Sequence, residues 1–204
     1  EEQRFQFVKD SIYEFVNSPA YLDSVDSVYN KVTLLNVVWD GVGFRNRTKK
    51  QSWRFGSLPE LISFDPINFL RLGPGVSYFR RFENEKTINV SGGLSIGLLN
   101  NDWKGNFRIG TKYDPIHLGR VDLYVGKRFD LLVFDDALFN KFQRNNWIET
   151  GYLVARTSRE LFNGLYSSLW YSYDDRSSID SYNFTPIFDS IFPGQVNAAA
   201  SFDG

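Results

Sequence analysis

The sequence contains no cysteine, no methionine and only one histidine, His117. Without cysteine the chain cannot form a disulfide, a zinc–thiolate site or a thiol nucleophile. A single histidine also argues against histidine-based metal sites and against most histidine-dependent catalysis. No run of about 18 apolar residues is present, so the sequence has no candidate transmembrane helix. Membrane-spanning strands are compatible with this composition, because their residues alternate in polarity and give no long apolar run.

The two ends of the chain lack the features of a complete gene product. The first residues are EEQRF, with neither a starting methionine nor a signal peptide. At the other end, a strand-like run at residues 197–202 is cut short by Gly204. We expect that the chain is a fragment or a processed form, that its true beginning lies upstream, and that it continues past Gly204.

The overall composition indicates one domain with a weak net charge. A chain of 204 residues is long enough for a single domain with a sizeable core. The formal net charge is −1, so no strong field attracts nucleic acid, and we expect no nucleic-acid partner. Aromatic residues make up 17% of the chain, which is high for a soluble domain and keeps a membrane protein under consideration.

Residues 87–98 show an unusual strand pattern. The even-numbered positions are aliphatic apart from Gly92, whereas the odd-numbered positions carry only small or polar side chains. Because side chains alternate between the two faces of a strand, one face is aliphatic and the other is small and polar. This combination suits a strand in a barrel wall that touches lipid. A half-buried strand of a soluble sandwich has the same pattern, so this segment alone leaves both interpretations open.

Three further runs share this architecture. Apolar residues alternate with polar or small residues at residues 70–78, 103–113 and 121–129, and short turns separate the runs. Pro74 interrupts the first run, where we expect a bulge or a kink because proline cannot donate a hydrogen bond to the sheet. No helical pattern lies between the runs. The sequence therefore predicts an all-β fold built on an antiparallel meander.

A short helix is predicted ahead of the strands. Apolar residues recur at helical spacing over residues 2–17, and the resulting amphipathic helix is expected to pack on the domain. Residues 21–30 are expected to form a linker or a short second helical turn. The residues at 32–39 are rich in β-branched side chains and predict the first strand, and residues 44–55 predict a hairpin or a lumen-facing strand.

The last third of the chain is less regular. Residues 135–146 break the alternation, and strand-like runs resume at residues 147–156 and 159–173. The second of these runs has large side chains at both parities, which indicates packing against both of its faces. Trp103 and Trp147 lie at strand starts, and three tyrosines are expected near strand ends: Tyr113, Tyr171 and Tyr173. Such positions fit the aromatic girdles of membrane barrels, or ordinary packing at the margin of a sheet.

The order of several segments resembles a known family. The matching segments are SPAYLDSVDSVYNKV at 18–32, FDPINFLRLGPGVSY at 64–78, GNFRIGTKYDP at 105–115, VGKRFDLLVFDD at 125–136 and LFNGLYSSLWYSYDDR at 161–176. Together they resemble an outer-membrane β-barrel family of unknown function that follows a carboxypeptidase-regulatory-like domain in Gram-negative bacteria. Residues 67–69 depart from the family pattern, which has Glu-Gly there. The resemblance implies a missing upstream domain and missing downstream strands, and it supplies no catalytic residues.

Motifs for chemistry are absent from the sequence. Residues 92–97 lack the Lys and Ser/Thr of a P-loop, and no dinucleotide fingerprint or nucleophile elbow occurs. The acidic pairs at 135–136 and 174–175 lack the spacing of a calcium loop, and His117 is expected to be a surface residue without a nearby partner. We therefore expect no catalytic residue, no cofactor, no metal site and no enzymatic activity.

The remaining functional candidates are basic residues on the polar parity of the predicted strands. They are Lys104, Arg108, Lys112, Arg120 and Arg128. Charge on the inner face of a barrel tunes the selectivity of a pore or holds a plug, so these residues are predicted to face a lumen. Simple solvation of a wet face explains each of them singly.

Taken together, the patterns predict an N-terminal helix and linker over residues 1–31 and part of an antiparallel outer-membrane β-barrel over residues 32–204. The expected role is that of a channel or ligand transporter, or of a scaffold for envelope assembly, in the bacterial outer membrane. Its expected partners are outer-membrane lipid and other envelope subunits. The alternative is a soluble antiparallel barrel or sandwich that binds a ligand or a protein.

Overall fold

The computed structural model describes residues 2–65, 67–132 and 144–183. The chain begins with two helices, α1 (Glu2–Asn17) and α2 (Pro19–Tyr29). The Ser18 hydroxyl caps α2 by accepting the backbone N–H of Tyr21 at 3.3 Å, and Pro19 occupies the first turn, where it is well tolerated. The helix predicted over residues 2–17 is confirmed. Where a linker or a single helical turn was expected, α2 forms a helix of 11 residues.

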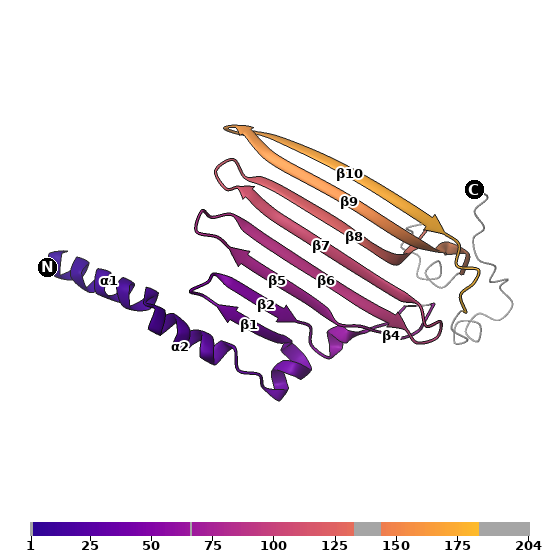
Figure 1. Cartoon of the computed structure of the whole chain (residues 1–204), viewed down its shortest axis with the longest axis horizontal. Helices are drawn as coiled ribbons and strands as arrows, with labels where there is room; N and C mark the ends of the chain where they lie inside the picture. The colour runs from indigo at the N-terminus through magenta and orange to yellow at the C-terminus, as the bar shows by residue number, and fades with distance from the viewer. Residues whose placement is uncertain (1, 66, 133–143, 184–204) are drawn as a thin grey trace.

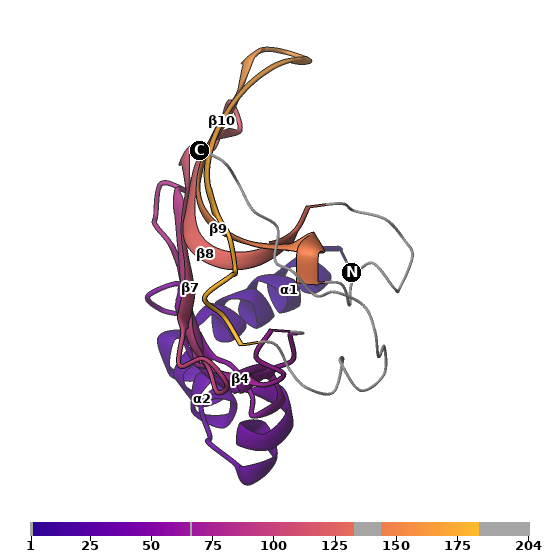
Figure 2. The same ribbon diagram turned by 90° about the vertical axis from the view of Figure 1, so that its right-hand side faces the viewer.

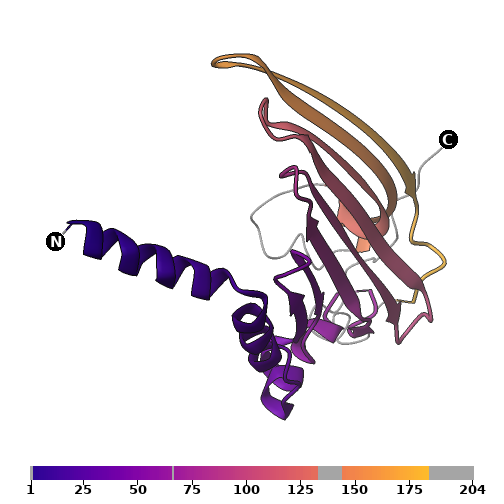
Figure 3. The same cartoon turned by 60° about the vertical axis from the view of Figure 1, so that its left-hand side comes forward.

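The apolar side of α1 is open to solvent, so the expectation that it packs on the domain is wrong. Phe5, Val8, Ile12 and Phe15 are between 48% and 71% exposed. Figure 3 shows α1 extending away from the sheet. An amphipathic pattern predicts which side of a helix avoids water, but it does not name the surface that covers that side.

Residues 32–39 do not form the expected first strand. They lead into a helical turn of the π type, η1 (Asn36–Asp40). The Thr33 hydroxyl accepts the backbone N–H of Asn36 at 3.2 Å and donates to the Asn36 side chain at 2.8 Å. This local pairing offers the backbone an alternative to a strand. The first strand starts only after Gly41, whose φ of 80° suits glycine and redirects the chain.

The strands form one antiparallel sheet in the order β1-β2-β5-β6-β7-β8-β9-β10, with β3 paired to β4 and β4 to β6. The bounds are β1 (Val42–Asn46), β2 (Gln51–Phe55), β3 (Ile62–Ser63), β4 (Arg71–Leu72), β5 (Gly75–Arg81), β6 (Thr87–Gly97), β7 (Trp103–Asp114), β8 (Gly119–Leu131), β9 (Trp147–Phe162) and β10 (Leu165–Ser177). Short 3-10 turns, η2 (Pro59–Leu61) and η4 (Arg144–Asn146), precede β3 and β9. The predicted antiparallel meander and the predicted hairpin at residues 44–55 are confirmed (Figure 1).

The register of β6, β7 and β8 confirms their predicted alternation. Ser91 pairs with Arg108, whereas Val90 pairs with Ile109 and Ile109 with Leu123. Partners across a sheet lie on the same face. One face is therefore polar and the other apolar, and these are called the polar face and the apolar face below.

The interruption predicted at Pro74 is also present. It separates β4 from β5, so that β6 pairs with both in succession. A Cβ atom on Gly73 would lie 2.0 Å from the carbonyl oxygen of Leu94. Glycine is required here because the two backbones approach closely.

The last two strands end differently from the prediction. The strand β9 runs unbroken to Phe162, and the turn falls at Asn163 and Gly164, where φ of Gly164 is 84°. Asn-Gly is a strong turn signal, and overlooking it joined the end of β9 to β10 in the prediction. Large side chains at both parities remain within β10 alone, where Tyr166 and Trp170 lie on the opposite face from Leu169 and Tyr171. Tyr171 and Tyr173 consequently lie inside β10 and not near its end.

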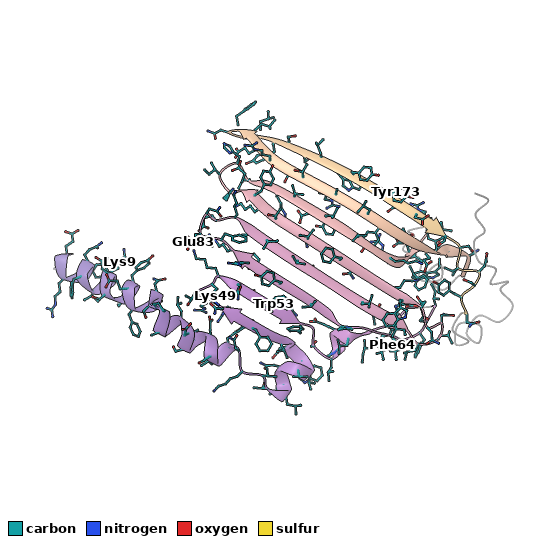
Figure 4. All side chains as sticks on the ribbon, in the orientation of Figure 1. Lys9, Lys49, Trp53, Phe64, Glu83 and Tyr173 are labelled. Atoms are coloured by element: carbon teal, nitrogen blue, oxygen red, sulfur yellow. The ribbon has the colours of Figure 1, made fainter. Side chains whose placement is uncertain are left out.

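The sheet is a single curved layer with little conventional core. Figure 2 shows it edge-on, with no second sheet stacked on it in the described part of the chain. The buried hydrophobic residues described are Ile67, Ile148 and Ile179. Trp53 on β2 and Tyr173 on β10 belong to the apolar face by register; they are 43% and 56% exposed (Figure 4). The described sheet is not closed, because β1 and β10 lie at opposite edges (Figure 1).

The two edges of the sheet are protected differently. The Asn30 side chain accepts the backbone N–H of Arg45 at 2.7 Å and donates to its carbonyl at 2.9 Å. Asp26 accepts the backbone N–H of Arg47 at 2.5 Å and the Arg45 guanidinium at 3.0 Å. The end of α2 therefore occupies the outer edge of β1. The strand β10 has no such cover in the residues described, although free edges favour pairing with further strands.

Candidate functional site

The five basic residues predicted to face a lumen all lie on the polar face. Register and alternation place Lys104, Arg108 and Lys112 of β7 beside Arg120 and Arg128 of β8. The structure does not leave them as an even row of solvated charges. It places three of them in two clusters of different composition, with Lys104 in a cluster near the start of β7 and Arg108 and Arg120 in one farther along the face.

The first cluster combines three cations with three carboxylates, and it is called the balanced cluster below. Its members are Asp65, Arg71, Asp102, Lys104, Lys127 and Glu149. They come from the loop before β4, from β4 itself, from the turn before β7 and from β7, β8 and β9. The start of β9 reaches this group because β8 and β9 continue past the last pair that joins β7 to β8.

Arg71 and Asp102 form the pair with the most hydrogen bonds in the balanced cluster. The Arg71 guanidinium donates to both Asp102 carboxylate oxygens, at 2.9 and 3.2 Å, and to the Asp102 carbonyl at 3.1 Å. It also donates to the Ser95 hydroxyl at 3.3 Å and to the Ser95 carbonyl at 3.1 Å. A side chain that is only 6% exposed needs this many partners to keep a charge away from water.

Lys104 and Glu149 form the second buried pair of the balanced cluster. The Lys104 ammonium bonds to Glu149, lies 3.1 Å from an Asp102 oxygen and donates to the Tyr182 hydroxyl at 3.1 Å. Glu149 also receives the Tyr182 hydroxyl at 2.6 Å and lies 2.7 Å from the Lys127 ammonium. The three donors of the lysine thus have three partners.

Two aromatic rings cover the lysine of this pair. The Lys104 ammonium lies 4.1 Å from the centre of the Phe129 ring and 4.9 Å from that of Tyr182, and the two rings meet edge to face at 5.3 Å. Cation–π contacts of this kind are strengthened by the exclusion of water. Tyr182 follows β10, so the cluster joins the segment after the last strand to the start of β7.

The pKa directions around the balanced cluster oppose acid–base chemistry. Burial alone raises the pKa of the Asp102 carboxyl, but hydrogen bonds from Arg71 and Lys104 outweigh burial and hold that pKa below its ordinary value of 3.8. Burial, the hydrogen bond to Glu149 and the carboxylate charges raise the pKa of Tyr182 above 10.0. The carboxyl therefore stays charged and the phenol stays protonated at neutral pH, and both pKa values move away from neutral pH, near which a general acid or base works best.

The second cluster is rich in arginine, and it is called the arginine cluster below. It consists of Arg108, Arg120, Asp122 and Arg156. The Asp122 carboxylate accepts Arg108 at 3.2 Å and Arg120 at 2.9 Å. Gly110 makes room for it, because a Cβ atom at that position would lie 2.5 Å from an Asp122 oxygen. Two arginines bond to this carboxylate and Arg156 stands opposite it in the register, so the region has an excess of positive charge.

The two remaining predicted residues lie beside these clusters. Lys112 stands directly opposite Arg120 in the register, an arrangement of like charges that is unfavourable. Arg128 donates to Asp130 at 2.8 Å and lies 4.8 Å from the centre of the Tyr152 ring. Arg128 is therefore already paired, whereas Lys112 adds to the positive charge near the arginine cluster.

A broad hollow of about 820 Å³ lies on the polar face next to the balanced cluster. Its lining includes the small polar residues of β5 and β6, such as Ser77, Ser91 and Gly93, and the side chains of Asn106 and Arg128. Small residues keep this part of the sheet surface low, so the hollow is wide and open to solvent.

The other sequence candidates do not form a site. The expectation that His117 has no nearby partner is wrong. Its Nδ1 lies 3.0 Å from Asp114, whose carboxylate also lies 3.0 Å from Arg159. In the residues described, no group of three or more histidine or acidic side chains is placed to hold a metal ion. The acidic pair at 174–175 lies within β10, and the pair at 135–136 falls outside the described residues.

No helix in the described part of the chain has both the length and the apolar character needed to cross a membrane.

Five members of the balanced cluster and the tyrosine that joins them were not predicted from the sequence. Asp65, Arg71, Asp102, Lys127 and Glu149 are ordinary charged residues in the sequence, and Tyr182 lies after the strand-like run at residues 159–173. No spacing links them, because turns and strand ends far apart in the chain bring them together. The available signal was that Lys104 and Glu149 lie near the starts of two predicted strands with one strand between them, because alternate strands of an antiparallel meander start at the same end of the sheet.

A comparison with known families finds a match over most of the chain. Residues 35–197, which are most of the chain, match the family described as "Family of unknown function (DUF5686) C-terminal domain". No curated protein and no solved structure matches the chain. The expected membership of a family of unknown function is confirmed, while the preceding carboxypeptidase-regulatory-like domain stays a prediction. The chain therefore belongs to the DUF5686 family, and its matched residues correspond to the C-terminal domain of that family.

Proposed function

We propose that this chain forms part of the wall of a β-barrel in the bacterial outer membrane and acts as a channel or ligand transporter without enzymatic chemistry. The observation that carries this proposal is the uncovered apolar face. Side chains such as Leu94, Phe107 and Val125 on this face are 53%, 44% and 41% exposed. Leaving such a face in water is costly, at about 25 cal/mol per Å², and lipid removes that cost.

The lengths of the strands support a membrane-spanning role. The five strands β6 to β10 contain between 11 and 16 residues, and a tilted transmembrane strand needs about 9–11 residues. The connections also differ between the two ends of the sheet, with hairpins at 82–86 and 163–164 on one side and longer segments at 56–70 and 132–146 on the other. Membrane barrels combine short turns at one end with longer loops at the other.

The polar face supports transport rather than catalysis. It carries a wide hollow of about 820 Å³, and its charged groups either pair with one another or stand in an arginine-rich group, with no nucleophile–base pair evident among the residues described. A role as an envelope scaffold uses the same membrane wall, with other envelope proteins as its partners. The alternative of a soluble barrel or sandwich requires a protein layer over the apolar face.

Lipid contact separates the membrane proposal from the soluble alternative. Asn106 and Phe107 are neighbours inside β7, both are exposed, and they point to opposite faces. Because the chain has no cysteine, Phe107→Cys and Asn106→Cys each provide a single labelling site. We expect a fluorophore at position 107 to be strongly quenched by lipids with brominated chains, and one at position 106 to be quenched much less. Equal quenching at both positions, or none at either, would refute the proposal and favour the soluble fold.

A further inference from the structure

A second hollow on the polar face lies away from the balanced cluster. It has a volume of about 530 Å³ and lies over β8, β9 and β10. The register arranges its polar lining in two rungs across these strands: Asp122, Arg156 and Trp170 in one, and Arg120, Ser158 and Ser168 in the other. This volume falls within the range of small-molecule sites, about 300–1,000 Å³.

Within residues 2–65, 67–132 and 144–183, one arginine of this hollow has no carboxylate partner. Arg156 stands opposite Asp122 in the register, but Asp122 is already bonded to Arg108 and Arg120. Arg156 instead lies 5.8 Å from the ring centres of both Tyr124 and Trp170. Its planar guanidinium therefore keeps its five donors available to a ligand.

The hollow contains more positive than negative charge. Arg120 and Arg156 line it together with one carboxylate, Asp122, and Arg108 beside the hollow also bonds to that carboxylate. In the balanced cluster, by contrast, three cations are matched by three carboxylates. An excess of guanidinium groups beside hydroxyls and aromatic rings is the chemistry that binds an oxyanion.

We propose that this hollow binds a small anionic ligand that carries a carboxylate or phosphate group attached to a ring. The oxyanion lies against Arg156 and Arg120, where two guanidinium forks and the hydroxyls of Ser158 and Ser168 supply donors. The ring stacks on Trp170, whose side chain is 67% exposed. The inference goes beyond the proposed function, because the same hollow is present on the polar face whether lipid or protein covers the apolar face.

Calorimetric titration of the detergent-solubilised chain with chosen probes tests this site. Phenyl phosphate, benzoate and inorganic phosphate represent the anions, and benzyl alcohol is the uncharged ring control. We expect the first three to bind, with phenyl phosphate tighter than inorganic phosphate, and benzyl alcohol to give no measurable binding. The ratio between phenyl phosphate and benzoate distinguishes a phosphate from a carboxylate as the preferred group. Binding of benzyl alcohol equal to that of phenyl phosphate would overturn the proposal.

Three variants assign the binding to this hollow. Arg156→Gln is expected to weaken phenyl phosphate by about 10-fold or more, because a charge-assisted bidentate contact is lost. Trp170→Ala is expected to reduce phenyl phosphate to the affinity of inorganic phosphate and to leave inorganic phosphate unchanged. The control is Arg128→Gln, which removes a cation from the same face that is paired with Asp130 and lies outside this hollow. Equal losses for Arg156→Gln and Arg128→Gln would indicate general charge attraction and refute the site.

This outcome is independent of the membrane proposal. Anion binding without lipid quenching at position 107 would retain the site and refute the barrel. Lipid quenching without specific anion binding would retain the barrel and refute the site. Circular dichroism of each variant confirms that the sheet is intact, so a loss of binding cannot be attributed to unfolding.

Discussion

The balanced cluster and the arginine cluster lie on the same sheet and are both built from charged residues, with Lys104 of the first and Arg108 of the second on the polar face of one strand, β7. In the balanced cluster, three cations meet three carboxylates, and the side chains of Arg71, Lys104 and Glu149 are only 6–8% exposed. In the arginine cluster, three cations meet one carboxylate, and Arg108 and Arg120 are 36% and 52% exposed. Complete pairing permits burial, whereas an unmatched charge has to stay near water. The first arrangement suits a structural role, and the second leaves capacity for a ligand.

The largest expected effect comes from breaking a buried pair in the balanced cluster. Glu149→Gln leaves the Lys104 ammonium without its main partner, and losing one member of a buried ion pair typically costs about 3–5 kcal/mol. We expect a loss near the lower end, about 3 kcal/mol, because Asp102 still lies 3.1 Å from the ammonium. The measurement is the free energy of unfolding by denaturant in detergent micelles.

The matched control for this change is an exposed ion pair. Glu60→Gln removes the partner of Arg54, and both side chains are at least half exposed, at 50% and 62%. Exposed pairs contribute about 0–1 kcal/mol, so this variant is expected to unfold almost like the parent. Similar losses for Glu149→Gln and Glu60→Gln would show that burial does not distinguish the balanced cluster.

An intermediate effect is expected in the arginine cluster. Asp122→Asn removes the single negative charge but keeps an amide oxygen for Arg108 and Arg120. Because both arginines reach water, we expect a loss of about 1–2 kcal/mol in unfolding free energy, from the weakened charge-assisted bonds. The same change is expected to tighten the binding of phenyl phosphate, since no acid then competes for the guanidinium groups. Weaker phenyl phosphate binding by this variant would contradict the distinction between the two clusters.

The smallest effect is expected at the tyrosine that joins the segment after β10 to the balanced cluster. Tyr182→Phe removes the hydrogen bond to Glu149 and is expected to cost about 1 kcal/mol at neutral pH. The control is Tyr173→Phe on the apolar face, where the hydroxyl has no described partner and the change is expected to stay within about 0.5 kcal/mol. A larger loss of unfolding free energy for Tyr173→Phe than for Tyr182→Phe would contradict a specific contribution of the Tyr182 hydroxyl to stability.

The raised pKa of Tyr182 gives the same comparison a pH dependence. A group whose pKa is higher in the folded state contributes stability that is complete below its unfolded pKa, which is 10.0 for this phenol. That stability is lost as the pH rises through the folded pKa. We therefore expect the parent chain to lose stability above pH 10.0, and Tyr182→Phe to lose less over the same interval. Parallel curves for the two proteins would contradict the assignment.

The regular strands could be predicted from the sequence because side chains alternate between the two faces of a strand, and this pattern is visible in the sequence. The strands β6, β7 and β8 follow from alternation alone, and their two faces are those that the sequence indicated. Residues 32–39 were wrongly predicted because β-branched content was weighed without alternation, and the local bond between Thr33 and Asn36 was not considered. The end of β9 was misplaced because Asn163 and Gly164 were read as part of a strand.

The clusters could be predicted only in part. The sequence placed Lys104, Arg108 and Arg120 on one face, which the register bears out, but it could not show that Lys104 is buried and that Arg108 shares an acid. That distinction depends on Glu149 and on Tyr182, which reaches Lys104 from 78 positions farther along the chain. Contacts between turns at such separations leave no periodic signal, so they require the folded arrangement.

The cap that α2 places on β1 makes the two edges of the sheet differ in how readily they accept a further strand. With Asn30 and Asp26 bound to the backbone of Arg45 and Arg47, an incoming strand at that edge has to displace existing hydrogen bonds, whereas at β10 it meets backbone groups that are free in the described structure. A further strand is therefore expected to pair with β10 and not with β1, and the pairing of two sheets through their β1 edges is disfavoured.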